Sequence, residues 1–197
     1  MLQARDNPFS VDRVQRFRYR PQGTTWEILL KKLEELGFRA AIVGPEGAGK
    51  TTLLEDLEPL LEALGFSLHW IRLNRETRQF EPGLIDSMSQ RLGERDVILF
   101  DGVEQLSRVR WEHFRWKTRR AGGLVITVHS PGRLPTLIDC ETSPVLLSQI
   151  AGEMLGTEPG VQLAQAEELW SKCDGNVREA LLEWYDRAAC GSKPERG

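Results

Sequence analysis

Residues 44–51 read Gly-Pro-Glu-Gly-Ala-Gly-Lys-Thr and match the pattern G-x-x-x-x-G-K-[ST]. Glycines at this spacing let the backbone curl so that successive N–H groups point at phosphate oxygens, next to the positive end of a helix. Lys50 is expected to reach the β- and γ-phosphates, and the Thr51 hydroxyl is expected to bind Mg²⁺. The predicted phosphate-binding residues are Gly44, Pro45, Glu46, Gly47, Ala48, Gly49, Lys50, Thr51 and Thr52.

A carboxylate ends a second apolar run, in which residues 97–100 are Val-Ile-Leu-Phe and Asp101 follows. An acid at this place lies beside the phosphate loop in such folds, so Asp101 is the second candidate Mg²⁺ ligand. The residue after it is Gly102, where many ATPases carry a glutamate, and the next acid is Glu104. The chain thus has no acid directly after Asp101.

The elements that would position these groups alternate along the chain between short apolar runs and helical periodicity. Runs of this kind predict parallel strands buried on both faces, hence an α/β domain whose functional side lies at the carboxyl ends of the strands. Pro59 is expected to kink or split the second helix near Leu57. The predicted strands are 39–43, 67–73, 96–100 and 124–128, and the predicted helices are 26–36, 51–64, 84–92 and 111–118.

The pattern changes beyond Pro144, where helical periodicity continues over 145–155, 162–170 and 177–188 without a further convincing strand. We therefore divide the chain into an α/β nucleotide-binding domain, residues 1–143, a small helical lid, residues 144–190, and a disordered tail, residues 191–197.

Composition restricts the class of protein. The chain has 197 residues and a formal net charge of −3, which excludes a polycationic protein. No apolar stretch is long enough for a membrane span or resembles a signal peptide, so a cytoplasmic protein without membrane association is expected. Cys140, Cys173 and Cys190 form no C-x-x-C pair and are expected to be reduced, with no disulfide framework or zinc site.

Two further segments carry a family resemblance. Residues 100–106, Phe-Asp-Gly-Val-Glu-Gln-Leu, resemble the D-G-x-[DE] Walker B variant of the NACHT and related signal-transduction ATPases. Residues 173–181, Cys-Asp-Gly-Asn-Val-Arg-Glu-Ala-Leu, resemble the G-N-x-R-x-A-L segment of AAA+ ATPases of the origin-recognition and transposition-regulator kind. In those relatives the acid equivalent to Glu104 polarises the attacking water, so the resemblance implies that Glu104 is the catalytic base, with Glu46 in the phosphate loop as its rival. The arginine equivalent to Arg178 is the second sensor of the lid in those relatives. Asn176 is expected to cap the helix that carries Arg178.

The resemblance covers roughly residues 7–188 and identifies the chain as similar to AAA+ and STAND P-loop NTPases. It implies a parallel sheet between helices with strand order 5-1-4-3-2 and a C-terminal helical lid. It also implies a sensor at His129 or Ser130, for which a surface or cleft histidine is the alternative interpretation. The Asn7-Pro8-Phe9 segment and Tyr19 resemble the part of these proteins that packs near adenine.

These features predict an ATPase that acts as a nucleotide-dependent molecular switch and hydrolyses Mg²⁺·ATP to ADP and phosphate. Two alternatives stay open: a small-molecule or nucleotide kinase, and a nucleotide-binding interaction module with little hydrolysis. A protein partner or a second copy of the chain would complete the cycle, and candidate arginine fingers are Arg133, Arg119 and Arg120.

Basic residues gather in two places, around residues 13–20 and 108–120. Such clusters are candidate contacts for nucleic-acid phosphates or for an acidic partner. A solvated helix face is the other interpretation.

Overall fold

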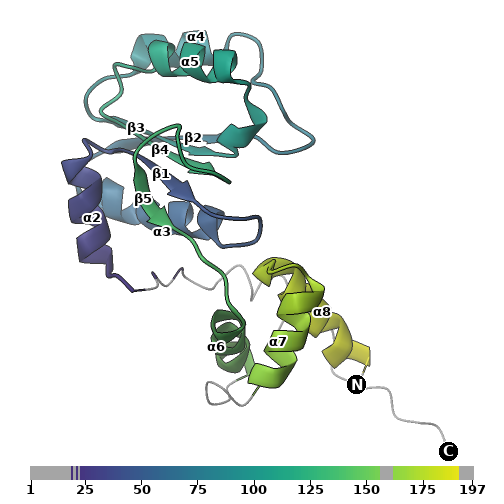
Figure 1. Cartoon of the computed structure of the whole chain (residues 1–197). Coiled ribbons are helices and arrows are strands. Elements are labelled where there is room, and N and C mark those ends of the chain that lie inside the picture. Colours follow the sequence, from purple (N-terminus) through teal and green to yellow (C-terminus); the bar gives the residue numbers. More distant parts are fainter. Residues whose placement is uncertain (1–18, 20, 22, 156–161, 191–197) are drawn as a thin grey trace, which may run out of the picture. The chain divides into compact units, whose positions relative to one another are not determined.

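The structure is a computed structural model that describes residues 19, 21, 23–155 and 162–190. It forms two compact units (Figure 1): one comprises Tyr19–Gly44 and Lys50–Cys140, and the other takes in Pro45–Gly49 and the chain from Glu141 onward. Several predictions lie outside the described residues. They concern the adenine-side segment 7–9, the tail 191–197, and Arg13, Arg16, Arg18 and Arg20 of the first basic cluster.

The first unit contains a five-stranded sheet in which every pair of neighbouring strands is parallel. This confirms the predicted α/β class with a parallel sheet flanked by helices. The order across the sheet is β2-β3-β4-β1-β5. The strands are β1 (Arg39–Val43), β2 (Ser67–Arg72), β3 (Asp96–Asp101), β4 (Gly123–Val128) and β5 (Thr136–Asp139).

The edge strand β5 has no counterpart among the residue ranges predicted as strands. It has only four residues and follows the segment Pro131–Pro135, which is rich in Pro and Gly. So short a run shows neither the alternation of a half-buried strand nor a continuous apolar stretch. Its position beside β1 comes from tertiary pairing, with Ile42 opposite Ile138.

Helices cover both faces of this sheet (Figure 1). The helices α2 (Trp26–Glu35) and α3 (Lys50–Ala63) lie on one face, and α4 (Leu84–Arg91) and α5 (Arg108–Lys117) lie on the other. A 3₁₀ turn, η2 (Val103–Gln105), follows β3. Strand residues alternate between the faces, so Ile98 and Phe100 pack with Trp111 and Phe114 of α5.

Pro59 does not split α3, which runs as one helix from Lys50 to Ala63, so the expectation of a split is wrong. Proline removes one backbone hydrogen bond from a helix interior. Pro59 is exposed, as is Glu55 four residues earlier, so the carbonyl without a partner can be hydrated. Burial of the opposite stripe holds the helix together, and this stripe consists of Leu53, Leu54, Leu57 and Leu61.

The described residues of the second unit form three helices, α6 (Pro144–Leu155), α7 (Leu163–Lys172) and α8 (Val177–Cys190). The predicted helical character of this region is confirmed. Its core includes Leu147, Leu169, Ala180 and Trp184. The Asn176 side chain accepts a hydrogen bond from the backbone N–H of Glu179 at 3.1 Å, so this residue caps α8 as expected.

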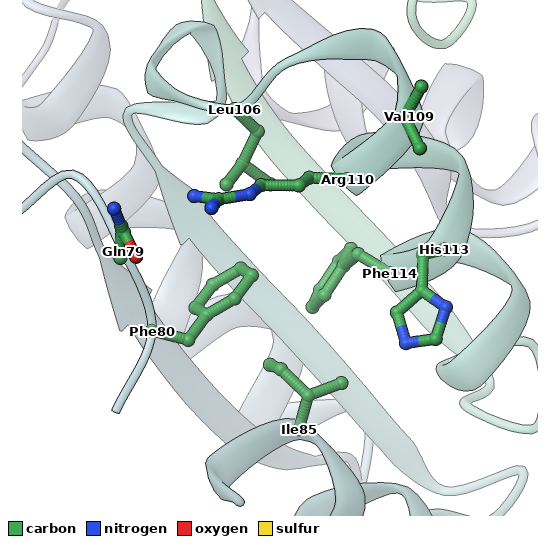
Figure 2. Close-up of a pocket in the computed structure, with 8 residues that line it drawn as sticks. All are labelled: Gln79, Phe80, Ile85, Leu106, Val109, Arg110, His113 and Phe114. Carbon is green, nitrogen blue, oxygen red and sulfur yellow. The ribbon is translucent and has the colours of Figure 1, made fainter. Parts of the chain in front are cut away.

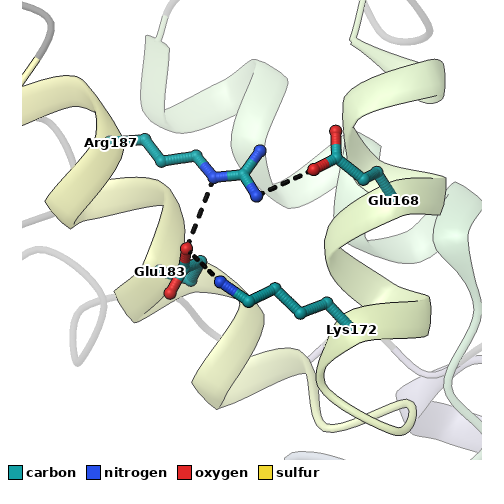
Figure 3. Close-up of polar contacts among 4 residues, drawn as sticks. All are labelled: Glu168, Lys172, Glu183 and Arg187. Carbon is teal, nitrogen blue, oxygen red and sulfur yellow. Dashed lines mark hydrogen bonds and ion pairs between the residues drawn. The ribbon is translucent and has the colours of Figure 1, made fainter.

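Exposed ion pairs join α7 to α8 (Figure 3). Nζ of Lys172 lies 2.6 Å from Oε1 of Glu183, and Nη2 of Arg187 lies 2.8 Å from Oε1 of Glu168. Hydrogen bonding to these cations lowers the pKa of both glutamates. Such exposed pairs contribute little to stability, so the apolar core provides most of the packing energy of this unit.

Two more expectations concern residues of the described part. Cys140 and Cys173 are free thiols, as predicted. Among the described helices, none combines the length and the apolar character that crossing a membrane requires.

A first prediction concerns Asp96 at the start of β3. Its carboxylate accepts hydrogen bonds from Nε2 of His69 at 2.6 Å and from the backbone N–H of Gly93 at 2.8 Å. Partial burial alone would raise the pKa of Asp96, but these hydrogen bonds outweigh it and lower the pKa. The stabilisation is therefore present above the pKa of about 3.9 of an unfolded aspartate and is lost as pH falls through the lower folded value.

We expect Asp96→Asn to lower the free energy of unfolding by roughly 1 kcal/mol at pH 7, and the difference from the parent to shrink below about pH 4. Urea titrations between pH 7 and pH 3 measure this. Glu94→Gln, at an exposed neighbouring position, is the control and should change little. Equal stability of Asp96→Asn and the parent at pH 7 would contradict the prediction.

Candidate functional site

The glycine-rich loop lies between β1 and α3, as its sequence predicts. Gly44, Gly47 and Gly49 have φ values of +152°, +76° and +80°, and residues other than glycine rarely adopt such values. Gly44 is also sterically confined, because a Cβ there would lie 2.5 Å from the backbone oxygen of Cys140. Positive φ values at these positions are compatible with the curled backbone that the motif predicts.

Lys50 is the first residue of α3, and only 8% of its surface is exposed. Its Nζ donates a hydrogen bond to the backbone oxygen of Gly44 at 2.8 Å. The ammonium group therefore turns back over the loop in which it is embedded. A buried cation needs anionic or polar partners, and the carbonyl of Gly44 provides one here.

Asp101 connects three elements through its carboxylate. Oδ2 accepts a hydrogen bond from Oγ1 of Thr51 at 2.9 Å, and Oδ1 accepts one from Oγ1 of Thr127 at 2.5 Å. The parallel register aligns the carboxyl ends of β3, β4 and β1, with Phe100 opposite Ile126 and Val43 opposite Val128. The structure thus brings together the two residues predicted to bind Mg²⁺, Thr51 and Asp101.

The side chains of Thr51 and Asp101 are suitable ligands for Mg²⁺. Mg²⁺ takes oxygen ligands and is usually bound through one or two protein groups, with water and phosphate oxygens completing its shell. A hydroxyl and a carboxylate that already meet at 2.9 Å supply that donor set. Thr51 is exposed, so the pair is open to a ligand on its outer side.

Glu104 lies in η2, three residues after Asp101. Its Oε1 is 3.6 Å from Nε2 of His129, which is an ion-pair distance when the imidazole is protonated. Its Oε2 is buried and has no hydrogen-bond partner among the described residues. An unpaired buried carboxylate oxygen is costly, and such groups concentrate at functional sites.

The geometry of Gly102 explains why no glutamate follows Asp101 directly. Gly102 has a φ of +86°, and a Cβ at this position would lie 2.0 Å from the backbone oxygen of Leu73. Any side chain here would displace the backbone that joins β3 to η2. Glu104 is the next acidic residue in the chain.

His129, which adjoins Glu104, is exposed after the end of β4, and so is Ser130. Thr52 is half-buried in α3, and Glu46 is exposed in the loop. Arg178 is exposed in the first turn of α8, in the second unit.

Arg133 is bound within its own chain. Its Nη2 donates to the backbone oxygen of Leu106 at 2.7 Å, and its guanidinium carbon lies 5.5 Å from the centre of the Trp111 ring. Burial lowers the pKa of Arg133, and the nearby charge of Glu104 acts in the opposite direction. The other two finger candidates, Arg119 and Arg120, are exposed after the end of α5, and Arg119 stacks on Trp116 at 4.8 Å.

Tyr19 lies in the first unit. Its hydroxyl donates to Sγ of Cys140 at 3.3 Å, and burial, followed by this hydrogen bond, raises the pKa of the phenol.

Two residues of the site were not predicted from the sequence, Thr127 and Gly102. Thr127 is buried, donates to Asp101, and accepts a hydrogen bond from the backbone N–H of Gly102 at 2.9 Å. The available signal was a single hydroxyl within the otherwise apolar run Leu-Val-Ile-Thr-Val, since a buried polar group requires a partner.

No protein-family model matches the chain, and no curated protein matches it. Its chemistry is therefore inferred from its own residues and their geometry.

The clash at Gly102 gives a prediction. We expect Gly102→Ala to lower the free energy of unfolding by about 1–3 kcal/mol more than Gly83→Ala does. Gly83 is the matched control because its φ is +81° but a Cβ there would meet nothing within 4 Å. Chemical denaturation of both variants measures the difference. Equal losses would mean that backbone strain alone, not the contact with Leu73, requires glycine at position 102.

The hydrogen bonds of Thr127 lead to a further prediction. Thr127→Val keeps the shape of the side chain but leaves the Gly102 N–H without its acceptor. It also removes one of the two hydroxyl donors to the Asp101 carboxylate, the other being Thr51. We expect a loss of about 1–3 kcal/mol in the free energy of unfolding. Thr136→Val, on the edge strand β5, is the control and should be nearly neutral. A loss no larger than that of the control would contradict the role assigned to Thr127.

Proposed function

We propose that this chain is a P-loop ATPase that binds Mg²⁺·ATP, hydrolyses it to ADP and phosphate, and changes conformation with the bound nucleotide. The observation that carries the proposal is the meeting of the Thr51 hydroxyl and the Asp101 carboxylate at 2.9 Å. Thr51 directly follows Lys50, whose ammonium group binds the Gly44 carbonyl of the glycine-rich loop. A phosphate-binding loop and a metal-binding carboxylate are the two parts that phosphoryl-transfer sites of this class require.

The topology supports the proposal. Read from the β5 edge, the sheet order is β5-β1-β4-β3-β2, which is the order expected from the resemblance to AAA+ and STAND NTPases. In such sheets ligands bind beyond the carboxyl ends of the strands, next to the place where the order reverses. The loop after β1 and the carboxylate of Asp101, the last residue of β3, both lie at carboxyl ends of strands.

In this proposal Lys50 exchanges its contact with the Gly44 carbonyl for the β- and γ-phosphates. Thr51 and Asp101 would hold Mg²⁺, which neutralises phosphate charge when bound. Glu104 accepts a proton from a water molecule as that water forms a bond to the γ-phosphorus, and the bond from this phosphorus to the ADP oxygen breaks. The free Oε2 of Glu104 supports its role, because a base needs an unoccupied lone pair.

His129 adjoins the base, and its distance of 3.6 Å from Glu104 supports a role for it in positioning that carboxylate. We assign Ser130 to the same sensor region and Arg178 to nucleotide-dependent closure of the helices α6–α8 as a lid. The switch acts on a protein partner or a second copy of the chain. Since the reaction consumes ATP, we place the protein in the cytoplasm.

The proposal predicts how two substitutions differ. Lys50→Ala should abolish ATP binding, because the phosphates lose their buried cation. Glu104→Gln should keep ATP affinity within about twofold but lower phosphate release by about a hundredfold or more, as expected for loss of a general base. Binding of a fluorescent ATP analogue and release of inorganic phosphate measure the two properties separately. Glu112→Gln, an exposed acid on α5, is the control.

Phosphate release should be measured over a range of protein concentrations. Specific activity that rises with concentration would show that a second copy completes the site. Retained turnover in Glu104→Gln would remove the assigned role of this residue. ATP affinity unaffected by Lys50→Ala would overturn the proposed function, as would phosphate transferred to a metabolite instead of water, which would identify a kinase. Binding without turnover under all conditions would identify a passive nucleotide-binding module.

A further inference from the structure

A pocket of about 360 Å³ lies between α4, α5 and the segment that precedes α4 (Figure 2). None of the candidate nucleotide-site residues lines it. Its walls are the apolar side chains of Phe80, Ile85, Leu106 and Phe114, with Val109 at its edge. This volume is at the small end of the range for ligand pockets, about 300–1,000 Å³, so it suits one or two large side chains.

The base of this pocket is rigid. The ring of Phe114 lies 5.6 Å from that of Phe80 and 5.1 Å from that of Phe100, which is fully buried in β3. Such aromatic contacts add to the area that these rings bury. The pocket is therefore preformed, which lowers the entropic cost of binding.

Apolar side chains on the helices around the pocket are partly exposed to solvent. The helix α4 has no buried residue, although Ile85 and Met88 pack against the core. On α5, Val109 is 81% exposed and Trp116 is 58% exposed. Exposed apolar groups concentrated around a pocket are typical of an interaction site.

The surrounding charge is strongly positive. Residues 74–91 and 107–120 contain nine Lys or Arg and four Asp or Glu, so they carry +5, whereas the whole chain carries −3. Two of the acids are already paired, Asp86 with Lys117 and Glu112 with Arg115. Within the described chain no carboxylate pairs with Arg110, whose guanidinium extends over the pocket (Figure 2).

We propose that this pocket binds an acidic protein segment that inserts a large apolar side chain, leucine or aromatic, between α4 and α5. The anchor contacts Phe80, Ile85 and Phe114, and a carboxylate next to it pairs with Arg110. The positive rim selects an acidic partner and accelerates its association. Protein is favoured over nucleic acid because apolar side chains make up most of the lining and suit an apolar anchor, whereas Gln79, Arg110 and His113 are the polar minority of the lining residues.

Fluorescence anisotropy with labelled synthetic peptides tests this on the full chain. Each peptide consists of Asp, Glu and Gly and has two central residues that are Phe, Leu or Ala. The Phe and Leu peptides should bind about tenfold or more tightly than the Ala peptide of identical charge, because they alone bury an apolar anchor. Salt should weaken binding of all three.

Two variants of equal charge change locate the site. Arg110→Glu should weaken binding of the Phe peptide about tenfold, whereas Arg120→Glu, outside the pocket, should have a clearly smaller effect. Val109→Asp, at the exposed rim, should act like Arg110→Glu. Unchanged thermal midpoints verify that the variants are folded.

Four outcomes would overturn the proposal. These are no binding of the Phe and Leu peptides, equal affinity for the Phe and Ala peptides, equal effects of Arg110→Glu and Arg120→Glu, and displacement of the Phe peptide by a more tightly bound oligothymidylate. The last would identify a nucleic-acid surface. The result does not depend on ATP hydrolysis, because no nucleotide is present in the assay.

Discussion

The carboxylate of Asp101 accepts hydrogen bonds from two hydroxyls that come from different elements, Thr51 of α3 and Thr127 of β4. This arrangement requires the carboxyl ends of β3, β4 and β1 to lie side by side at one edge of the sheet. Parallel pairing aligns them, because β4 lies between β3 and β1 and pairs with both in continuous register. The backbone of Gly102 is fixed by the same group of contacts, since its N–H donates to Thr127. Losing this carboxylate would therefore affect both the candidate metal-binding pair, Thr51 and Asp101, and the turn that carries Glu104.

Much of the fold is evident from the sequence because its signals are local. Residues 40–43 and 97–100 are continuous apolar runs, and such runs between helical patterns are typical of buried parallel strands. β5 is different, because its four residues form a strand only through pairing with β1. Pro59 shows the opposite limitation: its local preference predicts a split, but burial of the leucines on the other side of α3 overrides it.

The site was predictable to the extent that its residues form a motif or end a strand. Lys50, Thr51 and Asp101 satisfy this condition, and the structure brings Thr51 and Asp101 into hydrogen-bond contact. Gly102 lies in the Walker B-like segment and Thr127 lies within a strand, but what each residue does depends on a neighbour far along the chain. These neighbours are the carbonyl of Leu73 and the carboxylate of Asp101. A glycine after a strand has many explanations, and only the position of that carbonyl identifies the one that applies.

The turn between Gly102 and Leu106 belongs to both the candidate nucleotide site and the apolar pocket. Glu104 faces His129, while Leu106, two residues later, lines the pocket. Hydrogen bonds from Gln105 to Gly102 and from Leu106 to Val103 make this turn one rigid piece, and Arg133 binds the carbonyl of Leu106 while lying close to the charge of Glu104. A side chain that displaces Leu106 must therefore move the turn that carries Glu104 or break these bonds. Because only one residue separates Leu106 from Glu104, a displacement of the backbone at Leu106 also displaces Glu104.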